Sequence, residues 1–435
     1  MNYFKNILLI FLCTFTSVCA KTQNNELIKE FNFGKNLSQN SGVSINKPFL
    51  YTDSLGYGFD FRSYKNVKFK NDYLSGIKSV YFSVKLPEGN YKVDLVLGGN
   101  KCAVTTVKAE SRRLMLNSVK TNRNETVTKS FTVNVRTPSI DDNHKVKLKS
   151  REFDYLNWDN KLTLEFLGEF CIQSIRITPT SKVTTIFLAG DSTVTDQDIE
   201  PWASWGQYIT NYFSSDVVIA NHAASGLALS SFKSGNRLIK ILSEMKAGDY
   251  LFIEFGHNDE KTKGEGNGAW GLYTNLLKEF IYKFREKGGI PILVTPTQRR
   301  HFNEDGDLKS THGDFPDAMR KVAKDLNVPL IDLTKMTTLM YESWGDETSR
   351  NAFVQYPSNT FPGQTEKLED NTHFNNFGAN EIAKAVLLGI QQLKLDIAKY
   401  INPNTPNYNP NKPDNIQNWN VPMSLRFDTT KPEGN

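Results

Sequence analysis

The chain has 435 residues, of which 52 are lysine or arginine and 47 are aspartate or glutamate, so its formal net charge is only +5. This near balance, without any run of basic residues, argues against a nucleic-acid-binding protein. Aromatic residues make up 12% of the chain, which favours folded domains over extensive disorder, and the length suits two domains.

The first 20 residues have the pattern of a secretory signal peptide. Lys5 supplies a positive charge, residues 7–15 form an apolar stretch too short to cross a bilayer, and residues 18–20 form a small-residue cleavage site. We therefore expect a secreted or periplasmic protein whose mature chain has no membrane-spanning segment. A lipoprotein anchored at Cys19 is the alternative, although valine is a poor residue to precede a lipidated cysteine.

Residues 26–180 show the alternation of apolar and polar residues that is typical of β-strands, for example at 80–86 and 91–97. Short strands at regular spacing, separated by turn sequences, predict an all-β sandwich that folds by itself. Cys102 and Cys171 fall in this domain, and the sequence allows either a disulfide or two isolated buried thiols.

From residue 184 onward, continuous apolar runs alternate with helical patterns. Runs without a period of two indicate strands buried on both faces, so residues 183–398 predict a parallel sheet between two layers of helices. The strands are expected at 185–189, 217–220, 250–255, 290–295 and 330–331, and the helices at 202–213, 272–287, 315–326, 335–344 and 377–393.

Residues 402–435 form a tail that is rich in proline and asparagine. Apolar residues recur at every second position near its end, which predicts that the tail packs against the protein rather than extending into solvent. These residues are Trp419, Val421, Met423, Leu425 and Phe427.

Ser192 follows the first apolar run of the second domain, in the sequence Gly190-Asp-Ser192-Thr. Open α/β sheets place their chemistry at the carboxyl ends of strands, and a serine there can act as a nucleophile once a base takes its proton. Its backbone N–H, at the start of a helix, can donate to an oxyanion. By itself, this sequence is equally compatible with a serine that only caps a helix.

Two further loops follow strands of the same predicted sheet. Asn258 comes after residues 250–255, in Gly256-His-Asn258-Asp, and its side-chain amide can donate to a developing oxyanion. Gly226 follows residues 217–220, and a glycine lets its backbone N–H approach a ligand closely. Taken singly, Asn258 also fits a turn-capping residue and Gly226 a simple turn glycine.

Asp370 and His373 lie just before the helix expected at 377–393. At this spacing, on a loop or a helix start, Asp370 can bond to His373 Nδ1 and leave Nε2 facing the serine. Each residue alone also fits a helix cap or a polar surface position. In combination, Ser192, Asp370 and His373 supply the groups of an acyl-transfer site.

Other chemistries find less support in the sequence. The six histidines and the cysteines do not have metal-ligand spacing, and the glycine patterns of nucleotide-binding loops do not occur, so we expect no metal and no cofactor. Trp202, Trp205 and Trp270 lie near the site in sequence, where they can either stack on sugar rings or belong to the core.

The motifs Gly190-Asp-Ser192, Gly226, Gly256-His-Asn258 and Asp370-x-x-His373 resemble the four blocks of the SGNH hydrolase superfamily. The variants Gly-Asp-Ser-Thr, Gly-His-Asn-Asp and Asp-x-Thr-His-Phe-Asn resemble its rhamnogalacturonan acetylesterase branch. The resemblance implies a three-layer αβα fold, a catalytic triad and an oxyanion hole. It assigns the triad to Ser192, Asp370 and His373, and the oxyanion hole to Ser192, Gly226 and Asn258.

One block departs from the fungal members of that branch, in which arginines follow the glycine. Here Leu227 and Ser230 stand in their place, which puts the exact polysaccharide in doubt. The sequences Phe31-Asn-Phe-Gly34 and Gly56-Tyr-Gly-Phe-Asp60 resemble the galactose-binding-like modules that precede some bacterial relatives.

The sequence therefore predicts a carbohydrate esterase that removes O-acetyl groups from a pectic, rhamnogalacturonan-like polysaccharide of the plant cell wall, or from its oligosaccharides. An acetylxylan-type esterase and an SGNH lipase, lysophospholipase or thioesterase are alternatives with the same catalytic residues. A catalytically silent polysaccharide-binding protein is an alternative of another class, and turnover of 4-nitrophenyl acetate would separate it from the esterases.

Overall fold

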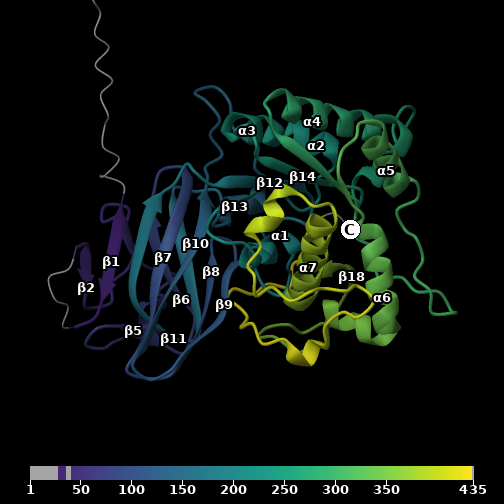
Figure 1. Cartoon of the computed structure of the whole chain (residues 1–435). Helices are drawn as coiled ribbons and strands as arrows, with labels where there is room; N and C mark the ends of the chain where they lie inside the picture. Colours follow the sequence, from purple (N-terminus) through teal and green to yellow (C-terminus); the bar gives the residue numbers. More distant parts are fainter. Residues whose placement is uncertain (1–27, 36–40, 434–435) are drawn as a thin grey trace, which may run out of the picture.

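The computed structural model describes residues 28–35 and 41–433. The predicted signal peptide at residues 1–20 lies outside them. A β-sandwich packs beside an α/β domain with a parallel sheet (Figure 1), which is the fold class that the sequence predicted. None of the helices within these two ranges is both long enough and apolar enough to cross a bilayer.

The sandwich is organised around the long strand β11 (Lys161–Pro179). Its first half pairs with β6 (Val80–Lys85) and β8 (Ala103–Ala109), and its second half pairs with β7 (Gly89–Gly99) and β1 (Lys29–Phe33). Since the two halves have different neighbours, β11 contributes to both layers, which enclose one apolar core. The other strands are β2 (Val43–Ile45), β3 (Tyr57–Asp60), β4 (Lys68–Phe69), β5 (Leu74–Gly76), β9 (Arg113–Thr121) and β10 (Glu125–Val135).

Cys102 and Cys171 do not form a disulfide. Cys102 is exposed and Cys171 is buried, and both are free thiols. Of the two possibilities that the sequence left open, the structure has the isolated thiols, but the expected burial is wrong for Cys102.

The parallel sheet of the α/β domain has the strand order β13-β12-β14-β15-β16. The first strand in the sequence, β12, therefore lies between the second and the third, and the chain winds outward from it in both directions. Such a reversal leaves a crevice at the carboxyl ends of the central strands. The strands occupy the positions expected from the sequence: β12 (Thr184–Gly190), β13 (Val217–Asn221), β14 (Tyr250–Glu254), β15 (Ile290–Val294) and β16 (Leu330–Ile331).

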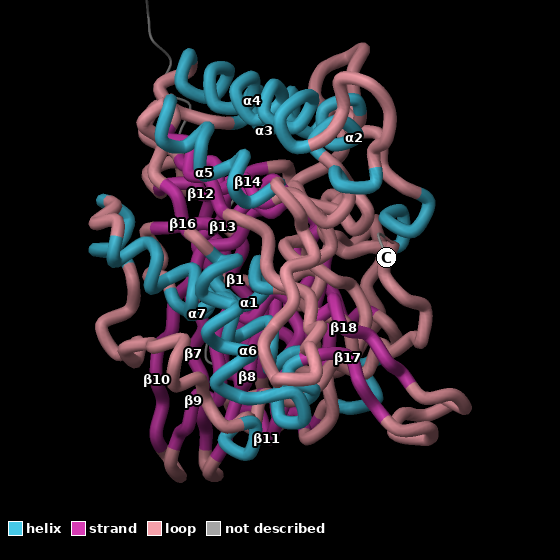
Figure 2. Tube along the Cα trace, turned by 90° about the vertical axis from the view of Figure 1, so that its right-hand side faces the viewer, coloured by secondary structure: helices cyan, strands magenta, loops and turns pink. Residues whose placement is uncertain are grey.

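Helices cover both faces of this sheet (Figure 2), and each layer has its own apolar core. One layer holds α1 (Trp205–Tyr208), α6 (Leu333–Ser349) and α7 (Asn376–Gln392). The other holds α4 (Thr274–Glu286) and α5 (Phe315–Asp325), together with two short helices that the sequence analysis missed, α2 (Leu229–Ser234) and α3 (Arg237–Glu244).

The tail packs against the protein. Trp419 lies against Tyr208 of α1 and Phe377 of α7, with ring centroids 5.8 and 6.1 Å apart, and Val421 is buried. Further along the tail the period of two does not describe the buried face, because Met423 is 40% exposed and Leu425 is 63% exposed.

A polar anchor sets the orientation of this part of the tail. The N–H of Ser424 donates to Glu200 Oε1 at 2.9 Å, and its hydroxyl donates to Glu165 Oε2 at 2.7 Å. These bonds place the serine inside and turn the neighbouring apolar residues outward.

Buried ion pairs join the sandwich to the α/β domain. Arg112 and Lys108 of the sandwich pair with Glu200, and Arg113 Nε lies 2.7 Å from Asp196 Oδ2. All five side chains are at most 3% exposed. A buried charge without its partner is strongly destabilising, so this interface argues against independent folding of residues 26–180.

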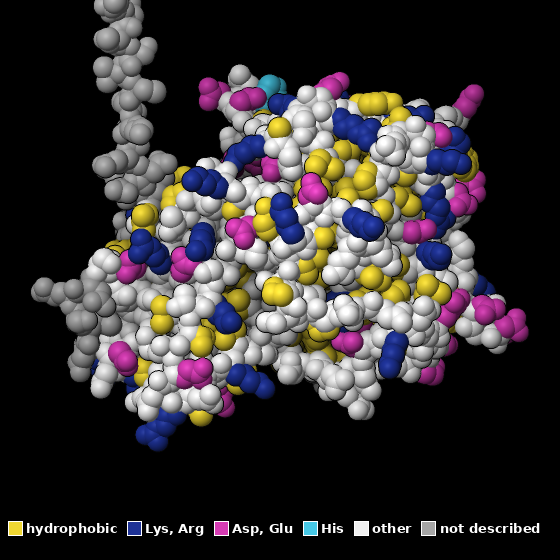
Figure 3. All heavy atoms as spheres, viewed as in Figure 1, with side chains coloured by type: hydrophobic (Ala, Val, Ile, Leu, Met, Phe, Trp, Pro, Cys, Tyr) yellow, Lys and Arg dark blue, Asp and Glu magenta, His cyan; other side chains and the backbone are white. Residues whose placement is uncertain are grey.

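The solvent-facing surface is different in character. On the face shown in Figure 3, basic and acidic side chains are interspersed, and neither sign dominates it. Exposed ion pairs contribute little to stability, whereas the buried pairs are costly to break because a lone charge would remain in the interior.

Replacing Glu200 by alanine tests this interface. The substitution leaves the cations of Lys108 and Arg112 buried without their carboxylate, so we expect the free energy of unfolding to fall by about 3–5 kcal/mol in urea titrations. The control is Lys321→Gln, which removes one exposed ion pair with Asp325. It should change the free energy of unfolding by less than about 1 kcal/mol. If Glu200→Ala lowered the free energy of unfolding by no more than this control, the network would not hold the domains together.

Candidate active site

Three predicted site residues follow three adjacent strands. Ser192 follows β12, Gly226 follows β13 and Asn258 follows β14, and β12 pairs with both of the others in parallel. Because the carboxyl ends of parallel strands meet at one edge of the sheet, the three loops converge there.

His373 connects Ser192 to Asp370. Its Nε2 atom lies 2.9 Å from Ser192 Oγ, and its Nδ1 atom lies 2.8 Å from Asp370 Oδ2. The three side chains are 1–3% exposed, so little water competes for these bonds. The structure thus brings together the three groups that the sequence analysis assigned to a triad.

The backbone around this pair differs from the expected loop or helix start. Asp370 and His373 lie on a short strand, β18 (Leu368–Phe374), which pairs with β17 (Phe353–Tyr356) in an antiparallel hairpin. Within it, Asp370 Oδ1 accepts the N–H groups of Thr372 and His373 at 2.8 and 2.9 Å. These two bonds orient the carboxylate independently of its bond to the imidazole.

The charge of Asp370 follows from these contacts. Burial raises the pKa of its carboxyl, but the hydrogen bonds from His373 and from two backbone N–H groups outweigh burial and hold the pKa at about 2. Asp370 is therefore ionised at neutral pH and accepts the Nδ1 proton of His373. That tautomer leaves the lone pair of Nε2 facing the Ser192 hydroxyl.

The two oxyanion candidates lie in linked loops. Gly226 has a φ of +77°, in the left-handed region that favours glycine, and a Cβ placed on it would come within 2.8 Å of Lys149 Nζ. Asn258 is 7% exposed, and its Nδ2 donates to Leu227 O at 3.2 Å. An amide nitrogen has two protons, so the second remains to be donated to a ligand.

Gln197 is a site residue that the sequence analysis missed. Its Nε2 donates to the backbone oxygen of Ser192 at 2.8 Å and lies 3.3 Å from Ser225 Oγ. It thereby bridges the serine loop and the glycine loop. Lys149 of the sandwich and Lys431 of the tail also reach the site, and nothing in the local sequence around any of the three signals such a role.

The three tryptophans near the site in sequence have different environments. Trp202 and Trp205 are at most 2% exposed and belong to the interior. Trp202 packs edge-on against His373, with ring centroids 5.9 Å apart, so it restrains the imidazole. Trp270 is 57% exposed and donates to Asp314 Oδ2 at 2.9 Å.

A buried carboxyl pair lies beneath the serine loop. The Thr193 hydroxyl is 2.9 Å from Asp191 Oδ1 and 3.0 Å from Glu254 Oε1, yet it has only one proton to donate. Burial, reinforced by the Asp191 carboxylate, raises the pKa of Glu254 to about 8. At neutral pH a protonated Glu254 can donate to Thr193, which in turn donates to Asp191.

This arrangement predicts a pH-dependent stability. Since the Glu254 carboxyl ionises near pH 4.5 in the unfolded chain and near pH 8 in the fold, the unfolded state binds fewer protons between these values. The free energy of unfolding should therefore fall as the pH rises from about 4.5 to about 8. Glu254→Gln keeps a neutral amide in place of the acid and should remove this contribution, which is up to about 5 kcal/mol.

The measurement is urea unfolding of the wild type and Glu254→Gln at pH 5 and pH 8. We expect the stability of the variant relative to the wild type to increase from the lower to the higher pH. An equal difference at both values would mean that Glu254 is ionised throughout.

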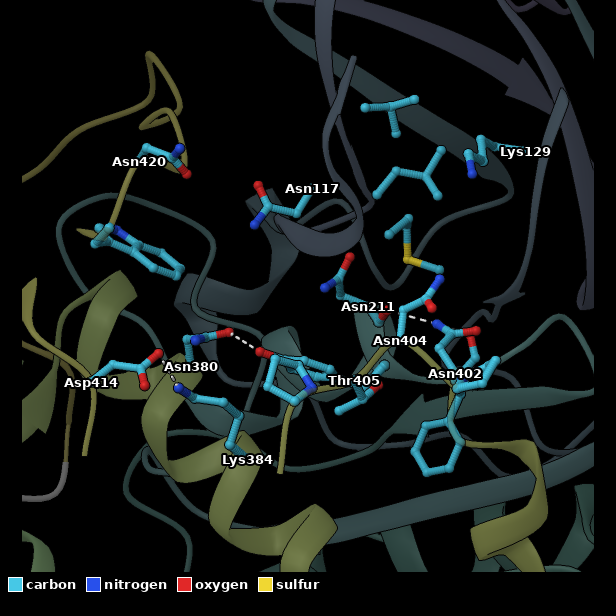
Figure 4. Close-up of a pocket in the computed structure, with 18 of the residues that line it drawn as sticks. Asn117, Lys129, Asn211, Asn380, Lys384, Asn402, Asn404, Thr405, Asp414 and Asn420 are labelled. Atoms are coloured by element: carbon cyan, nitrogen blue, oxygen red, sulfur yellow. Dashed lines mark hydrogen bonds and ion pairs between the residues drawn. The ribbon is translucent and has the colours of Figure 1, made fainter. Parts of the chain in front are cut away.

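A cavity of about 580 Å³ lies between the sandwich, α7 and the tail (Figure 4). Amide side chains such as Asn117 and Asn380 line it, and Lys384 there pairs with Asp414 at 2.6 Å. The described residues that line it do not include Ser192 or the other predicted site residues, so this cavity is separate from the candidate active site.

Comparison with known proteins places the chain in a family. Residues 188–379 match the model of the GDSL-like lipase/acylhydrolase family. The chain is 42% identical over 222 residues to the rhamnogalacturonan acetylesterase RhgT of Bacillus subtilis, an alignment that covers 51% of this chain and 95% of RhgT. The chain belongs to the GDSL-like lipase/acylhydrolase family. It is therefore an enzyme, a carboxylic ester hydrolase.

Other relatives cover different shares of this GDSL hydrolase. A probable rhamnogalacturonan acetylesterase of B. subtilis, YesY, is 35% identical over 219 residues, which are 50% of this chain and 96% of YesY. The crystal structure of B. subtilis YxiM has 22% sequence identity and a TM-score of 0.46, and it covers 85% of this chain and 99% of YxiM.

Proposed function

We propose that the protein is a serine esterase that removes O-acetyl groups from a rhamnogalacturonan-like pectic polysaccharide. The observation that carries the proposal is the hydrogen-bonded series from Asp370 through His373 to Ser192, with contacts of 2.8 and 2.9 Å. The similarity to RhgT supports the acetyl group and the polysaccharide. The signal-peptide pattern at residues 1–20 supports action outside the cytoplasm.

The geometry supports a two-step acyl transfer. Ser192 Oγ attacks the acetyl carbonyl carbon while His373 Nε2 takes its proton, and Asp370 stabilises the imidazolium. The negative oxygen of the tetrahedral intermediate accepts hydrogen bonds from the N–H groups of Ser192 and Gly226 and from Asn258 Nδ2. The carbon–oxygen bond to the sugar then breaks, and the sugar oxygen takes the proton from His373.

Water completes the cycle. It attacks the acetyl-serine carbonyl as His373 takes one of its protons, and acetate leaves when that proton returns to Ser192 Oγ. The reaction consumes one water molecule and releases acetate and a free sugar hydroxyl. Every group that it requires is a side chain or N–H of this chain.

The residues after Gly226 support a short acyl group. Leu227 and Leu229 are 6% and 0% exposed and belong to the apolar core on the α2 face of the sheet. Since they are packed in the core, they offer little apolar surface to a long acyl chain. The binding energy then has to come from the sugar side of the ester, as in a polysaccharide esterase.

Replacing Ser192 by alanine should abolish hydrolysis while the fold persists. Loss of a triad nucleophile can reduce turnover by about 10⁶-fold, because the remaining residues do not act independently. The measurement is the rate of acetate release from acetylated rhamnogalacturonan, with circular dichroism to verify folding. A folded variant that retains more than about a tenth of the activity would refute the role of Ser192.

The acyl-chain preference separates the acetylesterase from a lipase. A lipase would gain roughly 0.8 kcal/mol, or about fourfold, for each methylene that it buries. We expect kcat/KM to fall from acetyl to butyryl to octanoyl esters of 4-nitrophenol. A rise through the octanoyl ester would favour the lipase alternative with the same catalytic residues.

The polysaccharide itself requires a substrate panel. Acetate release from acetylated rhamnogalacturonan, homogalacturonan, xylan and mannan should be fastest with a pectic substrate. Preference for xylan would instead identify the acetylxylan-type alternative. If the protein hydrolysed neither these polysaccharides nor 4-nitrophenyl acetate, it would be the catalytically silent binding protein.

A further inference from the structure

Lysines from three separate parts of the chain converge on the catalytic loops. Lys149 precedes the 3-10 helix η3 (Ser150–Asp154) of the sandwich, Lys261 ends the 3-10 helix η5 (Asp259–Lys261), and Lys431 belongs to the tail. Each ammonium group contacts a catalytic loop: Lys149 Nζ donates to Ser225 O at 2.5 Å, Lys261 Nζ to Asn258 Oδ1 at 3.2 Å, and Lys431 Nζ lies 3.4 Å from Asp370 Oδ2.

One of these lysines already forms an ion pair with a carboxylate. Glu433 Oε2 of the tail lies 2.6 Å from Lys149 Nζ. Both side chains are next to Gly226, because a Cβ on that glycine would come within 2.8 Å of Lys149 Nζ and 2.9 Å of Glu433 Cβ. The chain's own carboxylate therefore lies beside the oxyanion glycine, where a substrate would approach.

This ion pair is weak enough for a ligand to replace it. Lys149 is 24% exposed and Glu433 is 50% exposed, and ion pairs in such settings contribute about 0–1 kcal/mol. Another carboxylate that is held in place by the rest of a substrate can therefore displace Glu433 at little cost.

The surrounding charges also favour an anion. Burial lowers the pKa of Lys261, and the nearby cations of Arg299 and Lys431 lower it further, although the carboxylates of Glu260 and Asp191 oppose them. Arg299 itself pairs with Glu260. Lys431 is 46% exposed and close enough to Lys261 to lower its pKa, so an anion bound near both would relieve the repulsion between the cations.

We propose that Lys149 and Lys431 form a subsite for the carboxylate of an acidic sugar residue, a uronate, next to the acetylated sugar. When no uronate is bound, the Glu433 carboxylate pairs with Lys149. This inference rests on the proposed carbohydrate esterase function and assigns recognition of the uronates in such a polysaccharide to particular residues. Lys149, Lys431 and Glu433 all lie outside residues 188–379, so the sandwich and the tail, rather than the part matched to the family, would select the charged substrate.

The test compares two forms of one substrate. Acetylated oligogalacturonate is used with its carboxyl groups free or methyl-esterified, and acetate release gives kcat/KM for each. The readout is the ratio of the two values, because any distortion of the Gly226 loop affects both forms alike and cancels. The wild type should prefer the free acid, and added salt should reduce the preference.

Lys149→Gln should lower this ratio about fivefold, mainly through KM for the free acid, and Lys431→Gln should lower it in the same direction. The matched control is Lys283→Gln. Lys283 pairs with Glu279 at 2.7 Å on the second half of α4, which precedes β15 and so lies toward the amino ends of the strands. The ratio of the two kcat/KM values for Lys283→Gln should equal that of the wild type. If Lys149→Gln lowers both rates equally, the lysine is only structural and the subsite is refuted.

Glu433→Gln tests the competing carboxylate. Removal of its charge should raise the ratio about twofold or more, through a lower KM for the free acid. A purely structural tail contact would lower both rates or leave the ratio unchanged, and either result would overturn the role of Glu433.

A binding experiment separates this inference from the proposed function. Trigalacturonate and the neutral xylotriose are titrated calorimetrically into Ser192→Ala and into Ser192→Ala carrying Lys149→Gln. The uronate should bind more tightly than the neutral sugar, and Lys149→Gln should weaken its binding severalfold. If the wild type releases no acetate, the esterase proposal fails. The titration still tests the subsite, because it measures binding without catalysis. Equal binding of both sugars would overturn it.

Discussion

The position of β12 between β13 and β14 is the constraint on which the site depends. It brings three loops to one edge of the sheet, although Ser192, Gly226 and Asn258 are far apart in the sequence. The hairpin of β17 and β18 then supplies His373 from outside the sheet, with Asp370 fixed by backbone N–H groups before it meets the imidazole. The site is thus preorganised by the backbone, and the side chains of Gln197 and Trp202 support it.

Local sequence was sufficient to predict the groups that lie within short motifs. Ser192, Asn258 and the Asp370–His373 pair each follow or precede a recognisable element, and the alternation of strands and helices predicted the fold class. The hairpin that carries His373 was not predicted, because β18 has a mostly polar sequence, Leu-Glu-Asp-Asn-Thr-His-Phe, without the apolar run that marks the strands of the parallel sheet. The helices α2 and α3 were also missed; they have six and eight residues, and α3 has a distinct buried face that includes Leu238 and Ile241.

Residues whose role depends on tertiary contacts could not be predicted. Gln197 bridges two loops, Lys149 reaches the site from the sandwich, and Lys431 returns from the tail, about 60 residues after Asp370. The buried pairs of Arg112 with Glu200 and of Arg113 with Asp196 also connect distant segments. They make the sandwich an integral part of the enzyme, although the family match covers only residues 188–379.

The central claim is that the Ser192 hydroxyl is the nucleophile, activated by His373. Its most direct test is labelling of the intact enzyme with a fluorophosphonate, followed by mass spectrometry of the peptides. We expect one adduct per chain, on Ser192, that forms in parallel with the loss of acetate release and does not form in His373→Ala. An adduct on another residue, or full esterase activity after complete labelling of Ser192, would contradict this mechanism.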